Sequence, residues 1–268
     1  MYFIVLDLEW NQKHQMRPDV RGISEIIELG AVRLDRDKRP AGVFSAVVHP
    51  AVYNDIHPYV GKLVHLDQDA LSEGAPFPQV MGQFDAFCGE GAVYLTWGTD
   101  DIMVLMQNFA YYGMDMNRPI RSINLQQLFS QQFETDGRSQ RSLSATIEML
   151  DIEKKWDFHS ALSDARYAAE IFMRLDTSKL DISFPEMPRY KGISARKKIR
   201  FRTNMGRQLQ CVCPVCAERS GDIQDYFGIS SRRMIVIAFC RQHGYFKTVC
   251  EMPRTAQRRG RPGDKKAK

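Results

Sequence analysis

The stretch YFIVLDLEW, residues 2–10, places two acidic side chains in the first apolar run of the chain. Its apolar part is typical of a strand that is buried on both faces. Side chains two positions apart on a strand point to the same face, so Asp7 and Glu9 are predicted to project together. Adjacent carboxylates in a partly buried place repel each other. The pair indicates either a divalent-metal site or an edge strand with basic neighbours.

The sequence that follows predicts a mixed sheet flanked by helices. Residues 25–35 and 41–50 are further strand candidates with a polar turn between them. Shorter apolar runs predict strands at 92–98 and 120–125. Helical periodicity marks the segments 66–74, 78–90, 100–113, 125–133, 142–150 and 160–175. Strands that come first and then alternate with helices predict an α/β fold with a mixed five-stranded sheet.

The segment TWGTDDIMVL, residues 96–105, puts an acidic pair where a strand gives way to a helix. Asp100 is predicted to cap this helix. Asp101 then lies in the first turn, near the end of the strand, where the helix dipole also tolerates a carboxylate. Capping alone would therefore explain both residues, and a metal-binding role for Asp101 depends on what lies near it.

The segment HSALSDARYA, residues 159–168, supplies the remaining polar groups. Ser160 is a good N-cap for a helix whose alanines allow close approach to the sheet. Asp164 falls at the end of the first turn, and His159 precedes the helix on a loop. Singly, each residue has an ordinary structural explanation. Together they indicate a helix that places the Asp164 carboxylate against the sheet, with His159 close to it.

These segments supply four carboxylates and one imidazole: Asp7, Glu9, Asp101, Asp164 and His159. Four acids can hold two divalent ions roughly 3.5–4 Å apart, an arrangement used for phosphodiester hydrolysis. A histidine beside the attacking water can act as a general base near neutral pH. This chemistry needs neither a cysteine nucleophile nor a glycine-rich phosphate loop.

The three segments resemble the signature motifs of the DEDDh-type 3′–5′ exonucleases, which have the RNase H-like fold. Order and spacing match over residues 2–175, and the W-G-x-x-D form of the middle motif is similar to the KapD/Eri-like branch. The resemblance implies a metal-dependent exonuclease that acts on the 3′ end of single-stranded RNA or DNA with two Mg²⁺ or Mn²⁺ ions. The alternative is a catalytically inactive nucleic-acid-binding adaptor with a nuclease fold.

The resemblance also assigns roles to the five residues. Asp7 would bridge both metals, and Glu9 and Asp164 would hold the metal on the side of the nucleophile. Asp101 would help to hold the other metal, with the spacing after Trp-Gly favouring it over the adjacent Asp100. His159 would be the general base.

The positions expected to meet the terminal nucleotide depart from the family pattern. Relatives often follow the first motif with Thr-Thr-Gly or Ala-Thr and later carry Thr-Gly-Ile, whereas this chain has Trp10-Asn11-Gln12 and Val64-His65-Leu66. Trp10, Asn11 and His65 are therefore candidate substrate contacts, and base stacking is expected to differ. Trp10 is open to two interpretations, stacking on a base or packing at the rim of the core.

The cysteines cluster near the C-terminus, where five of the six fall after residue 210. Cys213-x2-Cys216 and Cys240-x2-His243 have the spacing of a tetrahedral zinc site, and predict one structural Zn²⁺ in a ribbon-like module. Cys211 is a candidate substitute ligand. Buried free thiols are the alternative. Nearby aromatic side chains are open to either a core or a nucleic-acid-stacking role; these are Tyr226, Phe227, Tyr245 and Phe246.

Charge divides the chain into two parts. Residues 1–176 carry 16 Lys and Arg against 25 Asp and Glu, whereas residues 177–268 carry 21 against 7, for a net charge of +5. This asymmetry predicts an acidic catalytic domain with a basic, polyanion-binding extension. We expect an exonuclease domain at 1–176, a linker and basic segment at 177–207, a zinc-ribbon-like module at 208–252 and a disordered basic tail at 253–268. With no secretory signal or membrane span apparent, a cytoplasmic location is predicted.

Overall fold

The computed structural model describes residues 1–12, 21–64, 66–134, 137, 140–178, 180, 211–220 and 222–251. Within them, a six-stranded sheet has the order β4-β3-β2-β1-β5-β6. Its strands are β1 (Phe3–Asn11), β2 (Glu25–Leu34), β3 (Pro40–His49), β4 (Ala75–Pro76), β5 (Val93–Thr96) and β6 (Arg121–Asn124). The pairs β1–β2 and β2–β3 are antiparallel, and β1–β5, β5–β6 and β3–β4 are parallel. The predicted mixed sheet is confirmed, with the two-residue β4 as an additional edge strand.

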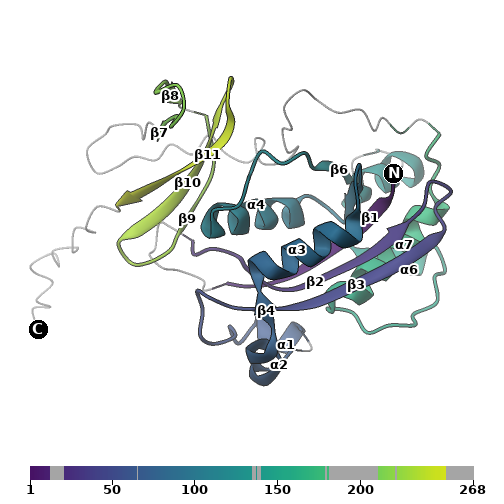
Figure 1. The fold of residues 1–268 in the computed structure, drawn as a ribbon. Coiled ribbons are helices and arrows are strands. Elements are labelled where there is room, and N and C mark those ends of the chain that lie inside the picture. The colour runs from purple at the N-terminus through teal and green to yellow at the C-terminus, as the bar shows by residue number, and fades with distance from the viewer. Residues whose placement is uncertain are drawn as a thin grey trace, which may run out of the picture.

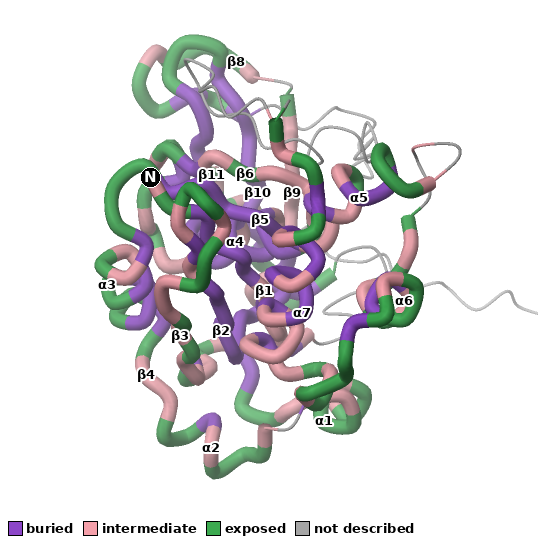
Figure 2. Tube along the Cα trace, turned by 90° about the vertical axis from the view of Figure 1, so that its right-hand side faces the viewer, coloured by how far each residue is buried: buried purple, intermediate pink, exposed green. Residues whose placement is uncertain are grey.

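Helices cover both faces of this sheet (Figure 1). They are α1 (Val60–Leu63), α2 (Gln68–Glu73), α3 (Phe77–Cys88), α4 (Asp100–Tyr112), α5 (Leu125–Phe133), α6 (Leu143–Met149) and α7 (Ala161–Arg174). One apolar cluster joins the sheet to α3 and α4, and another joins it to α5 and α7. Figure 2 shows buried residues following β1, β2 and β5 through the middle of the molecule. Because β1 lies between two apolar layers, most of its residues are buried. Burial alternates only toward its C-terminal end, where Asp7 and Glu9 are half-buried.

The C-terminal part of the chain forms two small antiparallel sheets. The larger has the order β11-β10-β9, and the smaller pairs β7 with β8. Their strands are β7 (Cys211–Val212), β8 (Arg219–Ser220), β9 (Ile223–Gly228), β10 (Arg233–Cys240) and β11 (Gly244–Glu251). The larger sheet lies against α4 (Figure 1). No helix among the described residues has the length and apolar character needed to cross a membrane.

Candidate active site and metal centres

Strand β1 carries the first two carboxylates to the end of the sheet. Asp7 lies opposite Gly30 of β2, and Glu9 lies opposite Glu28. The register then slips between Glu9 and Trp10, as in a β-bulge. Asp7 and Glu9 share a face of the sheet because they lie two residues apart before the bulge. The bulge interrupts the alternation of side chains, so the residues after Glu9 do not continue this pattern.

Asp101 reaches the same place because β5 is short. The parallel pairing of β1 with β5 extends only from Phe3 to Val5 of β1. The chain then leaves the sheet and begins α4, and Oδ1 of Asp101 accepts a hydrogen bond from the backbone N–H of Leu8 at 3.1 Å. The Asp101 carboxylate thus binds the N–H of Leu8, which lies between Asp7 and Glu9 beyond the part of β1 that pairs with β5. It is buried, whereas the adjacent Asp100 is exposed, which agrees with the choice of Asp101 from the Trp-Gly spacing.

The predicted N-cap of α4 is wrong by one residue. Thr99 holds the N-cap position and Asp100 is the first helical residue. The side chain of Thr99 makes no capping hydrogen bond at this end. The carboxylate of Asp101 accepts a hydrogen bond from Leu8 of the neighbouring strand β1, a contact that capping does not account for.

Helix α7 brings Asp164 to the cluster by passing close over β2. A Cβ atom at Gly30 would lie 2.1 Å from the backbone nitrogen of Leu162, so only glycine fits at this crossing. Ala161 and Ala165 are fully buried on the face of α7 that meets the sheet. The small residues predicted to permit close approach do so, and Asp164 is half-buried beside the end of β1.

The carboxylates raise one another's proton affinity. Burial, followed by repulsion from Asp164, Glu28 and Asp101, raises the pKa of Glu9 to about 8. Burial raises the pKa of Asp101 to about 7 in spite of the hydrogen bond from Leu8. The pKa of Asp7 is raised well above its ordinary value by burial and then by its acidic neighbours. Such a cluster is unfavourable when fully ionised and is relieved by divalent cations.

The donor set fits a hard divalent metal. One ligand atom from each of Glu9, His159 and Asp164 lies within 4.8 Å of the others. In the described part of the chain, Oδ1 of Asp164 is buried without a hydrogen-bond partner, as a carboxylate oxygen reserved for a metal would be. Oxygen donors of this kind suit Mg²⁺ or Mn²⁺.

The predicted substrate contacts have different surroundings. Trp10 is half-buried and packs against the apolar cluster on the α3–α4 side. Asn11 is buried, with its side chain donating to the carbonyl of Asp55 and accepting from the N–H of His57. Asn11 therefore anchors the loop after β3 and does not present its amide to solvent. His65 lies outside the described residues.

Two further acidic residues belong to this region and were not predicted. Glu28 is buried opposite Glu9 and accepts hydrogen bonds from residues at the start of α7. Glu25 is buried and accepts from the backbone N–H groups of Ala51, Val52 and Tyr53. The signal that could have found both is the presence of two acids within the apolar run EIIELGAV.

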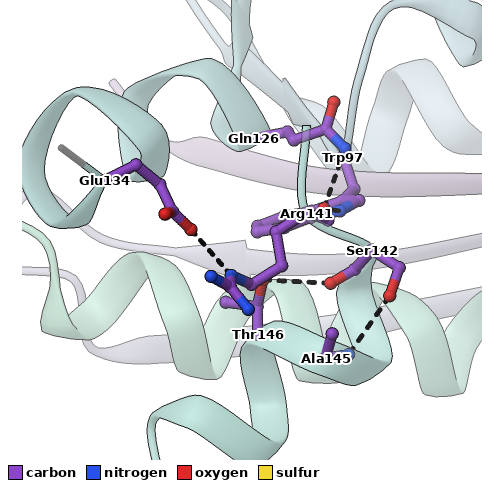
Figure 3. A network of polar contacts seen from close by, with 7 residues as sticks. All are labelled: Trp97, Gln126, Glu134, Arg141, Ser142, Ala145 and Thr146. Atoms are coloured by element: carbon purple, nitrogen blue, oxygen red, sulfur yellow. Dashed lines mark hydrogen bonds and ion pairs between the residues drawn. The ribbon is translucent and has the colours of Figure 1, made fainter. Parts of the chain in front are cut away.

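Trp97 of the middle motif anchors a loop beyond the site. Its Nε1 donates to the carbonyl of Arg141 at 3.2 Å, and Gln126 donates to the same oxygen at 2.9 Å. The Arg141 side chain forms an ion pair with Glu134 (Figure 3). The next residue, Ser142, caps α6 by accepting from the N–H of Ala145. The tryptophan thus anchors the chain at Arg141, directly before α6.

The Cys/His residues converge on a second point. Their ligand atoms all lie within 4.8 Å of one another; they are Cys213, Cys216, Cys240 and His243. The sulfurs of Cys216 and Cys240 are 3.8 Å apart, and the sulfur of Cys240 is 3.6 Å from Nδ1 of His243. Tetrahedral zinc with Zn–S bonds of about 2.3 Å has S···S edges of about 3.8 Å. Cys211 is not part of this group.

The β9–β11 sheet shares its core with the N-terminal domain. Phe227 and Tyr245 are buried within the apolar cluster that also holds α3 and α4. Gln107 of α4 accepts from the N–H of Ser24 and donates to Asp225 of β9. Asn117 donates to the carbonyl of Tyr245 and accepts from its N–H. The core interpretation thus applies to both aromatics, and also to Phe246, which is buried in the module's own cluster.

Comparison with known families agrees with this architecture. A family model described as an exonuclease matches residues 4–172. The chain therefore belongs to this exonuclease family. Its enzyme class is therefore that of an exonuclease, a hydrolase that acts on nucleic acids. Comparison with curated protein sequences gave no significant match.

Solved structures share the fold at low sequence identity. The nuclease domain of 3′hExo, a DEDDh family member bound to rAMP, is 19% identical with a TM-score of 0.59, covering 70% of this chain and 97% of that one. Cell-death related nuclease 4 is 18% identical (TM-score 0.55), covering 65% of this chain and 62% of that one. The Escherichia coli exonuclease I–ssDNA complex is 14% identical (TM-score 0.52), covering 67% and 41%. This chain thus spans less than two thirds of the latter two.

Proposed function

We propose that the protein hydrolyses phosphodiester bonds one nucleotide at a time from the 3′ end of single-stranded RNA or DNA. The observation that carries this proposal is the convergence of carboxylates from β1, α4 and α7 at one end of the sheet. Burial and mutual repulsion raise their pKa values, so the ionised cluster is unfavourable unless cations neutralise it.

The residues take the following roles in this proposal. Asp7, Glu9, Asp101 and Asp164 would hold two Mg²⁺ or Mn²⁺ ions. When bound, the ions supply positive charge to the attacking and leaving oxygens of an in-line displacement. His159 lies beside Glu9 and Asp164, where its ring can accept the proton of the attacking water. The bond between phosphorus and the 3′ oxygen of the preceding nucleotide breaks, this oxygen takes up a proton from solvent and stays on the shortened chain, and the terminal nucleotide leaves as its 5′-monophosphate.

The basic charge of the C-terminal part of the chain and the related structures both support a nucleic acid as the substrate. One structural relative is bound to rAMP and another to single-stranded DNA. Neither identifies the sugar that this chain prefers. A terminal nucleotide must bring its scissile phosphate to the carboxylates at the end of the sheet. A free single-stranded end can do so without breaking any base pair.

We also propose that Cys213, Cys216, Cys240 and His243 hold one structural Zn²⁺. Their near-tetrahedral spacing supports it, as does the small size of the sheet that they staple. The metal would hold residues 211–251 as a folded module against α4. The predicted linker, its basic segment and the basic tail lie mainly outside the described residues, and we retain for them a role in binding the nucleic-acid backbone.

A digestion panel tests the proposed function. Single-stranded and duplex RNA and DNA, each with free or blocked 3′ ends, would be incubated with Mn²⁺ and followed by gel electrophoresis. We expect stepwise shortening of free single strands and intact circular substrates. Cleavage of circles would indicate an endonuclease, and binding without any hydrolysis would indicate the inactive adaptor.

A further inference from the structure

The residue proposed as the general base is held in an unusual backbone conformation. His159 has φ of +66°, in the left-handed region, although it is neither glycine nor asparagine. Its side chain is exposed, and its own N–H is 3.4 Å from Oδ2 of Asp164. A left-handed histidine persists only where surrounding contacts hold it. One long hydrogen bond is a weak restraint, so other residues must fix this segment.

The first anchor lies before His159. Tyr167 is fully buried on α7, and its hydroxyl accepts from the N–H of Trp156 at 2.8 Å and donates to the carbonyl of the same residue at 2.6 Å. The ring of Phe158 stacks on that of Tyr167 at 4.9 Å and 18°. The ring of Trp156 meets it edge-on at 5.1 Å. A single side chain thus binds both polar backbone groups of Trp156 and both neighbouring rings.

The second anchor lies after His159. Oε1 of Glu28 accepts from the hydroxyl of Ser160, and Oε2 accepts from the N–H of Ala161, each at 3.2 Å. Ser160 holds the N-cap position of α7 but makes no side-chain cap with its own helix. A carboxylate of β2 therefore binds the first turn of α7 from outside.

We propose that Tyr167 and Glu28 are positioning residues that together hold His159 over Glu9 and Asp164. This inference rests on the proposed role of His159 in proton transfer. Neither anchor touches the reacting atoms. Each binds the backbone within three residues of His159, one on each side, so that the short segment carrying the imidazole is held at both ends.

Tyr167→Phe tests the first anchor, because it removes the hydroxyl and keeps the stacked ring. With an end-labelled single-stranded oligonucleotide and Mn²⁺, we expect kcat to fall roughly 10- to 100-fold with KM unchanged, as for other small displacements of a catalytic group. The matched control is Tyr94→Phe, which removes a buried hydroxyl from the α3 side of the sheet. This control should keep the wild-type kcat.

A double-variant comparison separates positioning from general destabilisation. In a His159→Ala background, Tyr167→Phe should change the residual rate by less than about twofold, because the group being positioned is gone. Equal losses in both backgrounds, or an unchanged kcat in the single variant, would overturn the proposal.

Hydrogen exchange gives a readout that does not depend on activity. The amides of 156–161 should exchange faster in Tyr167→Phe and in Glu28→Gln than in the wild type or in Tyr94→Phe. Unchanged exchange in Tyr167→Phe overturns the first anchor, and unchanged exchange in Glu28→Gln overturns the second. If the wild type does not hydrolyse the substrate but the variants show this difference in exchange, the proposed function is contradicted and the two anchors still stand.

Discussion

The carboxylate cluster of the exonuclease sheet and the Cys/His cluster of the C-terminal module place ligands in opposite ways. The first takes oxygen donors from three elements at the edge of a large core, and leaves a buried oxygen of Asp164 without a hydrogen-bond partner. The second takes three sulfurs and one nitrogen from the β7–β8 and β10–β11 turns of two small sheets, at distances that close a tetrahedron. An open oxygen site suits catalysis and a closed thiolate site suits structure. The contrast teaches that the two clusters differ in ligand chemistry in the way that the two proposed tasks require.

The largest expected effect is at the open site. Asp101→Asn keeps an acceptor for the N–H of Leu8 but removes a negative charge from the proposed metal site. We expect hydrolysis with Mn²⁺ to fall roughly 10³-fold or more, because a catalytic metal supplies several kcal/mol of charge stabilisation. Asp100→Asn is the matched control, since Asp100 is exposed next to it. Comparable losses in both variants would contradict the choice of Asp101.

The closed site should respond in metal content and folding rather than in chemistry. Cys240→Ser should lower the bound zinc from about one ion per chain to none. It should also make residues 211–251 sensitive to proteolysis. Metal analysis and limited proteolysis measure both. Cys250→Ser is the control, since Cys250 lies on the same sheet but outside the cluster. Loss of zinc from the control as well would remove the assignment.

The two regions share a core, and the polar contacts between them should contribute measurably. Asn117→Ala leaves both the N–H and the carbonyl of Tyr245 without this partner. We expect the free energy of unfolding to fall by about 1–3 kcal/mol. Chemical denaturation of the full chain measures it. An unchanged midpoint and slope would show that the docking is maintained by apolar packing alone.

The smallest effect is a pH dependence of stability in metal-free protein. Burial raises the pKa values of Asp101 and Glu9 from 3.8 and 4.5 to about 7 and about 8. Between these limits the folded state binds more protons than the unfolded state, so stability falls as pH rises from about 4 to about 8. Tm measured across this range should decline with EDTA present and decline less with Mn²⁺. A Tm that rises with pH would contradict the clustering.

Much of the site was predictable because it depends on local pattern. The helix of HSALSDARYA and the strand of YFIVLDLEW have strong periodicity, and their small or acidic residues carry recognisable chemistry. The spacing of the cysteine pairs likewise predicts their convergence. Each of these features is visible within about ten residues of sequence.

The features that were missed depend on single long-range contacts. Gln107 binds both Ser24 and Asp225, and nothing in the sequence pairs these positions. Phe227 and Tyr245 alternate as any strand residues would, so the pattern cannot say that they pack on another domain. Asn11 was interpreted as a substrate contact from its position after the first motif in the family pattern, whereas its amide binds the backbone of Asp55 and His57.

The most direct test of the central claim is the location of bound Mn²⁺ by anomalous X-ray scattering from crystals of the full chain soaked in Mn²⁺. The account predicts two sites roughly 3.5–4 Å apart, bounded by Asp7, Glu9, Asp101 and Asp164. No Mn²⁺ at this end of the sheet, or Mn²⁺ held only by residues elsewhere, would contradict it.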